Sequence, residues 1–387
     1  KGQCGNSCGG GDPYIGAFHY ELELKKKSNS KIHLFAGKDY SMINDIRTLF
    51  KDSAAVEEEL NLVKLDWKKK LDMKLKFPKK VHGEQKAYIK TFFPYQIYQQ
   101  SFGMVRSYYR GYRDVAQDSM GMSFLHRNNS EKLIKEICSK QLKNGSCLRQ
   151  WSTCTDFHDT RDFRDLPFWL IVAVCHFIQH KGDDIILWED VKYFNQRKKE
   201  SVLEHMKKAL HYSLKYGPND LLIMGEGDWN DALSGLGKKA ESVWLSQFAY
   251  YAISLMIECH VYMIYDFGID LFKERDRLYE GVIKQWNGKW FNRAISETGK
   301  VIGGEERMFL LPQAWFVISK MGLRDPIKAE LALNHMLEKL DHEYGLLLCH
   351  PSFEEYEEEI GRLSALAPGV AENFAIYNHA TAFAAFA

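Results

Sequence analysis

A helical repeat of apolar residues runs through most of this 387-residue chain. It begins near residue 41, where Ile43, Ile46, Leu49 and Phe50 stand three, three and one positions apart, a spacing that puts side chains on one face of an α-helix. The same repeat returns, with polar loops between, in segments 56–73, 95–109, 115–127, 130–142, 166–180, 198–215, 241–264, 312–321, 326–340 and 374–387. No alternation of strands and helices follows residue 40, so the pattern predicts a mainly α fold with one large helical domain.

Residues 12–36 follow a different period. Apolar residues alternate with polar ones on both sides of the turn-like segment KKKSNSK, at Phe18, Tyr20, Leu22, Leu24, Ile32 and Leu34. Strict alternation is typical of half-buried β-strands. We therefore expect two strands joined by a loop, as the end of a β-domain that precedes the helices.

The composition indicates a folded protein and excludes several classes of partner. Hydrophobic residues make up 45% of the chain and charged residues 27%, which allows a sizeable core. The 52 basic and 51 acidic residues leave a net charge of +1, so no bulk attraction to nucleic acid is expected. No apolar run approaches the ~20 residues of a membrane span, and no signal peptide is visible.

The eight cysteines are scattered and form no CxxC pair, so a zinc finger is not indicated. We expect reduced, structural cysteines and a cytoplasmic location. The chain opens on Lys1 and stops at Ala387 within an apolar stretch, so both ends resemble cuts in a longer protein.

The loops between the predicted helices are rich in Gly, Trp, Asp, Arg and His, as in GYRD, DFHDTRD, GEGDWND and APGVAEN. Functional residues concentrate on loops that a rigid scaffold holds in place. We therefore expect these loops to meet in one site at the mouth of a helical barrel.

The motif GEGDWNDAL, residues 225–233, places Asp228 and Asp231 on either side of Trp229 and Asn230. A carboxyl beside an indole ring is partly removed from water, so it can hold a proton at neutral pH and deliver it to a leaving oxygen. Alternatively, Asp231 caps a helix that begins at Ala232. Both interpretations remain open on the residues alone.

The motif GYRDVAQD places Arg113 and Asp114 at a helix start, with Asp118 four residues beyond Asp114 on the same face. The fork of N–H donors on an arginine suits a phosphate or a pair of sugar hydroxyls. The alternative is an internal ion pair at a helix N-terminus.

Two further motifs carry candidates. HDTRDFRDLPFW, residues 158–169, contains Arg161 and Asp165, for which a solvated charge cluster is the alternative. PGVAENFAIYNHA, residues 368–380, contains Glu372 and His379, which would share a face if the segment were helical. The alternative for His379 is a core position. No Walker A loop, Rossmann fingerprint or HExxH pattern occurs, so no metal site and no cofactor are predicted.

Taken together, these motifs resemble the inverting sugar phosphorylases of glycoside hydrolase family 94, which include cellobiose and chitobiose phosphorylases. GEGDWNDALSGLGKKAESVWL is similar to that family's GGGDWNDGMN…G.G.ESVWL, and GYRDVAQD is similar to its G(F/Y)RDxxQD. HDTRDFRDLPFWL resembles its TR.SDD..WL less regularly. The motifs follow the family's order from about residue 12 to 387.

The resemblance implies an (α/α)₆ barrel behind an N-terminal β-sandwich. Residues 1–36 would be the last strands of the sandwich, 37–60 a helical linker and 61–387 the barrel, apparently truncated at its C-terminus. It also implies inverting phosphorolysis of a β-linked gluco-disaccharide or oligosaccharide, with inorganic phosphate as co-substrate. The expected products are an α-sugar 1-phosphate and a shortened sugar, and a homodimer is one expected assembly.

The resemblance assigns roles by motif position. Asp231 would be the general acid. Substrate-binding roles fall on Arg113, Asp114, Asp118, Trp229, Arg161, Asp165 and Glu372, and phosphate-binding roles fall on Arg106, Arg113 and His379.

Three features depart from the family pattern. Only SYYRGY separates Arg106 from Arg113, where the family has a longer loop. Phe374 and Ala375 replace two glycines beside the expected phosphate pocket, where their side chains could crowd it. The C-terminal segment that carries a phosphate-binding Thr and Gly is absent from the sequence.

Three different functions stay open beside a free-standing phosphorylase. The first, an inverting hydrolase on the same barrel, would need a second carboxylate to activate water, and Glu372 is the candidate. A phosphorylase needs no such base, because phosphate is itself an anionic nucleophile. The second is a sugar-binding protein with a decayed site, and the third is a phosphorylase domain within a larger glucan synthase. A β-1,2-oligoglucan is one candidate substrate, since GYRDVAQD and DWNDAL differ from the commonest cellobiose-type wording.

Overall fold

The computed structural model describes residues 21–34, 43–71, 76–103 and 109–387. The chain divides into two compact units, Lys1–Lys70 and Leu71–Ala387. The predicted boundary between linker and barrel, at residue 60, lies inside helix α2, whereas the boundary between the two units follows the end of that helix.

The described part of the first unit contains α1 (Ile43–Leu49) and α2 (Ser53–Lys70). Residues 21–34 form a turn and no strand, and Leu22, Leu24, Ile32 and Leu34 are 44–65% exposed. A strand needs a neighbouring strand for its backbone hydrogen bonds, and the described part of this unit offers only helices. The structure assigns no strand to residues 21–34, and the rest of the expected β-sandwich end lies outside the described residues, so the β-sandwich stays a prediction.

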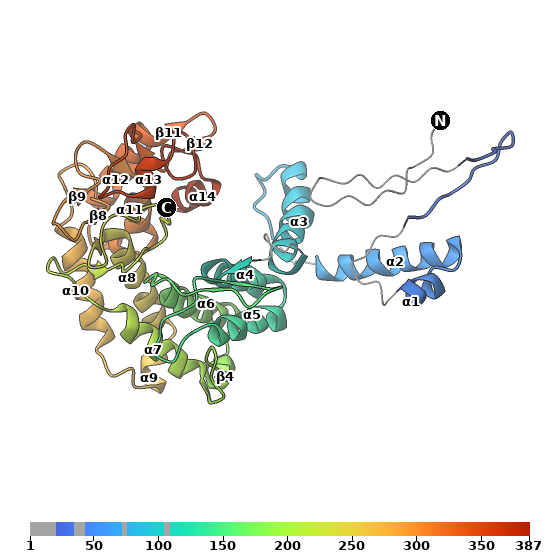
Figure 1. The fold of residues 1–387 in the computed structure, drawn as a ribbon, viewed down its shortest axis with the longest axis horizontal. Coiled ribbons are helices and arrows are strands. Elements are labelled where there is room, and N and C mark those ends of the chain that lie inside the picture. Colours follow the sequence, from blue (N-terminus) through green and yellow to red (C-terminus); the bar gives the residue numbers. More distant parts are fainter. Residues whose placement is uncertain (1–20, 35–42, 72–75, 104–108) are drawn as a thin grey trace. The chain divides into compact units, whose positions relative to one another are not determined.

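The second unit is built mainly from helices (Figure 1), and their burial and packing divide them into an inner and an outer layer. Each inner helix except the last packs against the next inner helix along the chain and against an outer helix that follows it. The inner helices are α4 (Tyr112–Leu125), α6 (Leu166–Lys181), α8 (Val243–Glu258), α11 (Leu310–Ile318) and α14 (Asn378–Phe386). The outer helices are α5 (Arg127–Ser139), α7 (Val202–Ser213), α10 (Leu271–Ile283) and α12 (Pro326–Leu340). Helix α3 (Gly83–Tyr98) and the π-turn η2 (Gln99–Gly103) pack on α4.

The sequence explains which helices lie inside. Helices α6 (LPFWLIVAVCHFIQHK) and α8 (VWLSQFAYYAISLMIE) are apolar on nearly all sides and are buried along most of their length. Helix α10 (LFKERDRLYEGVI) is apolar on one side only, so it covers the barrel and faces solvent. The mainly α fold is therefore confirmed, and its layers alternate as in an α/α barrel.

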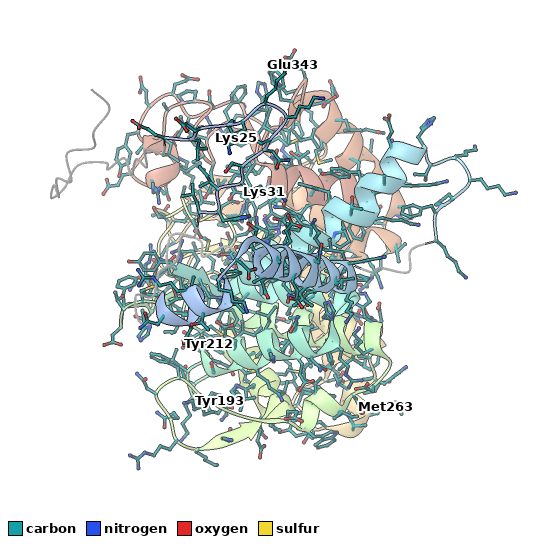
Figure 2. All side chains as sticks on the ribbon, turned by 90° about the vertical axis from the view of Figure 1, so that its right-hand side faces the viewer. Lys25, Lys31, Tyr193, Tyr212, Met263 and Glu343 are labelled. Carbon is teal, nitrogen blue, oxygen red and sulfur yellow. The ribbon has the colours of Figure 1, made fainter. Side chains whose placement is uncertain are left out.

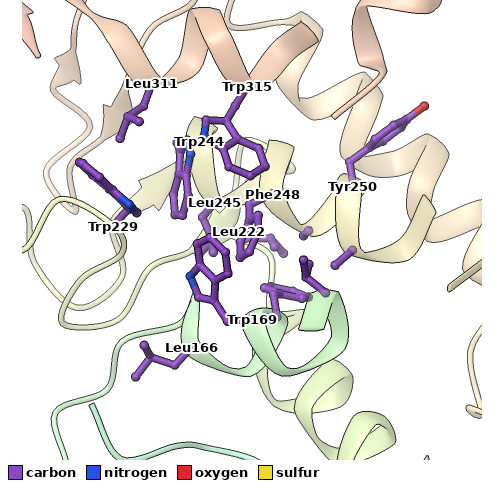
Figure 3. Close-up of a cluster of buried hydrophobic side chains, with 14 of the residues drawn as sticks. Leu166, Trp169, Leu222, Trp229, Trp244, Leu245, Phe248, Tyr250, Leu311 and Trp315 are labelled. Atoms are coloured by element: carbon purple, nitrogen blue, oxygen red, sulfur yellow. The ribbon is translucent and has the colours of Figure 1, made fainter. Parts of the chain in front are cut away.

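The core between the inner helices is aromatic (Figure 3). The ring centroids of Trp169 on α6 and Phe248 on α8 lie 4.4 Å apart. Phe248 stacks on Trp244 at 5.2 Å and meets Trp315 of α11 edge-on at 5.2 Å. These contacts fix three successive inner helices relative to one another. At the periphery of this unit lie Met263 of α9 (Val261–Ile264), which is 70% exposed, and Glu343 (Figure 2).

Very short antiparallel strands connect the loops that lead into the helices. β1 (Tyr109–Gly111), β7 (Glu241–Ser242) and β10 (Met308–Phe309) lead directly into the inner helices α4, α8 and α11. β1 pairs with β2 (Gln150–Ser152), which pairs with β3 (His158–Asp159). β7 pairs with β6 (Leu222–Ile223) and β8 (Ala294–Ile295), and β8 pairs with β9 (Val301–Ile302). β10 pairs with β13 (Cys349–His350). These strands hold together the loops at the N-terminal ends of the inner helices.

The remaining elements are β4 (Asp190–Lys192) paired with β5 (Lys199–Ser201), β11 (Asp341–His342) paired with β12 (Gly345–Leu346), the 3₁₀ turns η3 (Ile185–Trp188) and η4 (Met321–Leu323), and α13 (Arg362–Ala365). Within the described ranges no helix is long and apolar enough to cross a membrane. The described cysteines, Cys138, Cys147, Cys154, Cys175, Cys259 and Cys349, are free thiols.

Candidate active site

The loop that carries GDWND is held by a buried ion pair. Arg293 and Asp228 are both fully buried, and Arg293 Nη2 donates to Asp228 Oδ1 over 2.5 Å. The second oxygen of Asp228 accepts from the hydroxyl of Ser242 at 2.6 Å, while Oδ1 also accepts from the backbone N–H of Asn230 at 3.1 Å. Asp228 therefore shapes the loop from within and does not face a substrate.

The glycines of this motif let two loops dock together. Gly225 has a φ of +66°, and a Cβ there would lie 2.5 Å from the Asp162 carbonyl oxygen. A Cβ on Gly227 would lie 2.6 Å from the ring of Phe163. Backbone bonds join the two loops, since Glu226 N donates to Asp162 O at 2.8 Å. The motifs DFRD and GEGDWND thus form one structural unit.

Asp231 lies between two arginines. Its Oδ1 accepts from Arg113 Nη1 at 3.1 Å, and its Oδ2 accepts from Arg149 Nη2. Arg149 is itself held by Asp159, whose Oδ2 lies 3.1 Å from Arg149 Nη1. No helix follows Asp231, since residues 232–240 form turns and irregular chain, so the alternative of a helix cap is wrong. The side chain of Asp231 is 31% exposed and remains accessible.

Arg113 is fully engaged by protein acceptors. Its Nε and Nη2 donate to the carboxylate of Asp165 at 2.9 and 3.2 Å, and Nη1 donates to Asp231. The backbone carbonyls of Asp228 and Trp229 accept from the remaining N–H groups at 2.8 and 3.5 Å. Burial lowers the pKa of Arg113, but the charges of Asp165 and Asp231 raise it by more. This arrangement orients the GDWND loop, and the predicted phosphate contact of Arg113 stays a prediction.

Asp165 occupies the N-cap position of α6 and is fully buried. Besides Arg113, it accepts a hydrogen bond from Trp169 Nε1 at 2.9 Å. In this geometry Asp165 fixes the position of Arg113. The side chain of Asp165 is fully buried, so its predicted contact with substrate has no support here.

A cavity of about 180 Å³ opens beside Asp231. Its lining brings together six of the predicted residues, Arg113, Asp114, Trp229, Asp231, Glu372 and His379, with Gln117 and Tyr377. Gln117 and Tyr377 were not predicted as site residues. They nevertheless belong to motifs identified in the sequence, GYRDVAQD and IYNHA. The expected meeting of loops from distant parts of the chain is confirmed for these residues.

One wall of the cavity is aromatic. The ring of Trp229, which lies beside the core cluster in Figure 3, meets Tyr377 edge-on at 5.5 Å and His379 at 5.6 Å. His379 also lies 4.5 Å from the ring of Phe383, within α14. Aromatic faces of this kind suit the apolar faces of sugar rings.

Glu372 enters the cavity from the loop before α14. Its Oε2 accepts from Asn230 Nδ2 at 3.0 Å and its Oε1 accepts from Ala232 N at 3.1 Å. Burial, together with the nearby charge of Asp231, raises the pKa of Glu372 to about 7. Because α14 begins only at Asn378, Glu372 and His379 do not share a helix face, and the loop conformation brings them to one cavity.

The other candidates lie outside this lining. Asp118 is a partly buried residue of α4, one turn beyond Asp114. Arg161 is 54% exposed, binds Asp159 through Nη2 at 2.7 Å, and lines a separate cavity of about 230 Å³ with Glu226 and Lys238. Arg106 lies outside the described residues.

Phe374 and Ala375, which replace two glycines of the family pattern, are absent from the lining of the cavity beside Asp231. Phe374 adopts a φ of +58°, a conformation that favours glycine, and its ring lies 5.5 Å from that of His350. Ala375 is 8% exposed, and its carbonyl accepts from Leu348 N at 2.9 Å. Neither residue lines this cavity, and the crowding expected at the phosphate pocket stays a prediction.

Sequence reasoning missed Arg149 and Arg293. Each makes its decisive ion pair with a residue far along the chain, 82 residues away for Arg149 and 65 for Arg293. An arginine just before the apolar pair Ala294–Ile295 was the only local signal for Arg293.

Comparison with known proteins identifies the class of this fold and site. The Glycosyl hydrolase 94 superfamily, catalytic domain, matches residues 95–387. The chain belongs to this family, as its motifs predicted.

Several characterised relatives are phosphorylases. The solabiose phosphorylase of Paenibacillus borealis is 33% identical over 71% of this chain and 36% of the relative. The 3-O-beta-D-glucopyranosyl-beta-D-glucuronide phosphorylase of the same organism is 25% identical over 100% and 51%. The N,N'-diacetylchitobiose phosphorylase of Vibrio proteolyticus is 24% identical over 98% and 52%. The chain thus spans between about a third and a half of the length of these relatives.

Among solved structures, the cellobiose 2-epimerase of Bacillus thermoamylovorans B4167 superposes with a TM-score of 0.52 at 8% identity, over 78% of this chain and 81% of the epimerase. This likeness concerns the fold alone and agrees with the two-layered helical barrel.

Proposed function

We propose that the protein cleaves a β-linked gluco-disaccharide or oligosaccharide with inorganic phosphate and inverts the anomeric configuration. The observation that carries this proposal is the cavity in which Asp231 faces Trp229, Tyr377 and His379, in a chain of the family to which sugar phosphorylases belong. The names of the relatives refer to different sugars, so the proposal does not specify one glycosidic linkage.

In the proposed reaction, Asp231 donates its proton to the glycosidic oxygen as the bond to the anomeric carbon breaks. A phosphate oxygen attacks that carbon from the opposite face, which gives the α-sugar 1-phosphate. Trp229, Tyr377, Asp114 and Gln117 would hold the sugar through stacking and hydrogen bonds. His379 would contact phosphate, together with Arg106.

The two arginines on Asp231 fit a reversible reaction. Charge-assisted hydrogen bonds from Arg113 and Arg149 stabilise the carboxylate, which is the form that accepts a proton when a glycosidic bond is made.

The second candidate function is inverting hydrolysis, with Glu372 as the base that activates water. It rests on the pKa of about 7 for Glu372 and on its place in the same cavity as Asp231. The two hydrogen bonds that Glu372 accepts from the GDWND loop favour a role in holding that loop.

Phosphate dependence separates the two functions. Full-length protein would be incubated with a panel of β-linked glucobioses, including the β-1,2 isomer, with and without phosphate. We expect glucose 1-phosphate to form only when phosphate is present. Glucose release at the same rate without phosphate would establish hydrolysis instead. We also propose a cytoplasmic location and a homodimer, as expected from the sequence. Light scattering of the purified protein would test the homodimer.

A further inference from the structure

Glu372 binds the two residues that flank Asp231. Its Oε2 accepts from the side chain of Asn230 at 3.0 Å, and its Oε1 accepts from the backbone N–H of Ala232 at 3.1 Å. Both carboxyl oxygens are therefore used by the loop on either side of Asp231.

The hydrogen bond from Asn230 has a fixed direction. Asn230 Oδ1 accepts from Nε and Nη2 of the buried Arg293 at 3.1 and 2.9 Å, so its amino group must point the other way, toward Glu372. Because Ala232 N is also a donor, position 372 requires an acceptor at both of its polar atoms. A carboxylate supplies two acceptors, whereas an amide supplies one.

Glu372 itself stands on a firmly held loop. Its neighbour Asn373 is fully buried and donates to the carbonyls of Phe353 and Leu366, each at 2.8 Å. Asn373 also accepts from Phe353 N at 2.8 Å. Glu372 therefore connects a rigid part of the α13–α14 segment to the GDWND loop, about 140 residues away in sequence.

We propose that Glu372 is the positioning residue of Asp231: by holding Asn230 and Ala232, it fixes the direction in which the Asp231 carboxyl faces the cavity. This role rests on the proposed catalytic function of Asp231. It differs from a direct contact between Glu372 and sugar, which would use the same oxygens for hydroxyl groups.

The test is a pair of substitutions that exchanges donor and acceptor. Glu372→Gln brings an amino group against either Ala232 N or the amino group of Asn230, so two donors face each other. We expect kcat to fall by about 10²-fold, the order of loss that follows a displacement of about 1 Å of a reacting group. Adding Asn230→Asp supplies an acceptor for the new amide, while its other oxygen still accepts from Arg293. The double variant should regain at least about tenfold of the lost kcat.

The controls separate this role from others. Asn230→Asp alone places two carboxyl groups against each other and should also lower kcat, whereas Glu355→Gln, at an exposed acid of a neighbouring loop, should leave it unchanged. The kcat of every variant is measured in the reaction that the wild type catalyses, either phosphorolysis or hydrolysis. The role of Glu372 can therefore be tested even if the protein is not a phosphorylase.

Two outcomes would overturn the inference. The first is a double variant no more active than its weaker parent, although its thermal unfolding temperature equals that of the wild type. The second is a Glu372→Gln variant with an unchanged kcat and a raised KM for sugar alone, which would indicate direct substrate binding.

Discussion

At the scale of single residues, the chemistry depends on how one carboxyl is held. Asp231 is exposed enough to reach a substrate, yet Arg113 and Arg149 bind both of its oxygens, and Glu372 holds its neighbours. A short side chain with four such restraints has little freedom to reorient. Enzymes gain rate from this kind of preorganisation, because the reacting group need not be ordered during the reaction.

Asp231→Asn should abolish cleavage of an unactivated disaccharide. An amide of the same shape cannot donate the proton, so we expect kcat to fall by at least about 10²–10⁴-fold. The rate would be measured as glucose 1-phosphate release at saturating phosphate, with circular dichroism to verify that the fold is intact. Near-normal turnover by this variant would contradict the role of Asp231.

The pKa of Glu372 predicts a pH-dependent stability. Its folded pKa of about 7 lies above the ordinary value of 4.5, so the folded state binds more protons than the unfolded state between these values. Stability should therefore fall as the pH rises from 4.5 to about 7, by on the order of 1–3 kcal/mol, and stay lower above that range. Thermal unfolding from pH 4 to 8 should show this component in the wild type and not in Glu372→Gln. Parallel curves for the two proteins would show that Glu372 titrates normally.

At the scale of elements, the site is a set of loops locked to the N-terminal ends of the inner helices. Arg293, from the end of one loop, holds Asp228 and Asn230 of another, and the DFRD loop packs on the glycines of GEGDWND. Disturbing one of these contacts should therefore affect both stability and activity.

Arg293→Met should destabilise the protein strongly. The change leaves the buried carboxylate of Asp228 without its partner, which typically costs about 3–5 kcal/mol. Lys300→Met removes the solvent-accessible pair with Glu357, whose side chains are 44% and 39% exposed, and should cost less than about 1 kcal/mol. Denaturant unfolding of both variants would compare the two values, and equal small losses would mean that the Arg293 network contributes little.

The sequence predicted the helices and motif loops better than the contacts between them. Periodicity located α4, α5 and α12 to within a few residues, because a helix buries one face in a regular pattern. It joined α8 and α9 into one segment, although the chain breaks at His260, which has a φ of +55°. The pairing of Arg149 with Asp231 was not predictable, since no local pattern tells which distant carboxylate a partly buried arginine will meet.

At the scale of the whole molecule, two helical layers bring motifs from residues 111 to 379 to one end of the barrel. Helices α6 and α8 fill the centre and the outer helices shield them, so a substitution in a loop leaves the core contacts in place. This division explains why ENFAIYNH can depart from the family pattern at Phe374 and Ala375 while Glu372 and His379 still line the cavity beside Asp231.

The stereochemistry of the product tests the function of the molecule as a whole. A single displacement, with Asp231 on the leaving-group side and phosphate on the other, must convert a β-glucoside into an α-sugar 1-phosphate. Proton NMR in the first minutes of reaction would follow the anomeric signal of the sugar phosphate, which cannot mutarotate, before the reverse reaction consumes it, with chemically prepared α- and β-glucose 1-phosphate as standards. A β-phosphate product would require two displacements and a covalent intermediate. The cavity would then need a nucleophilic carboxylate about 5–5.5 Å from the acid, and Glu372 would be the residue to examine.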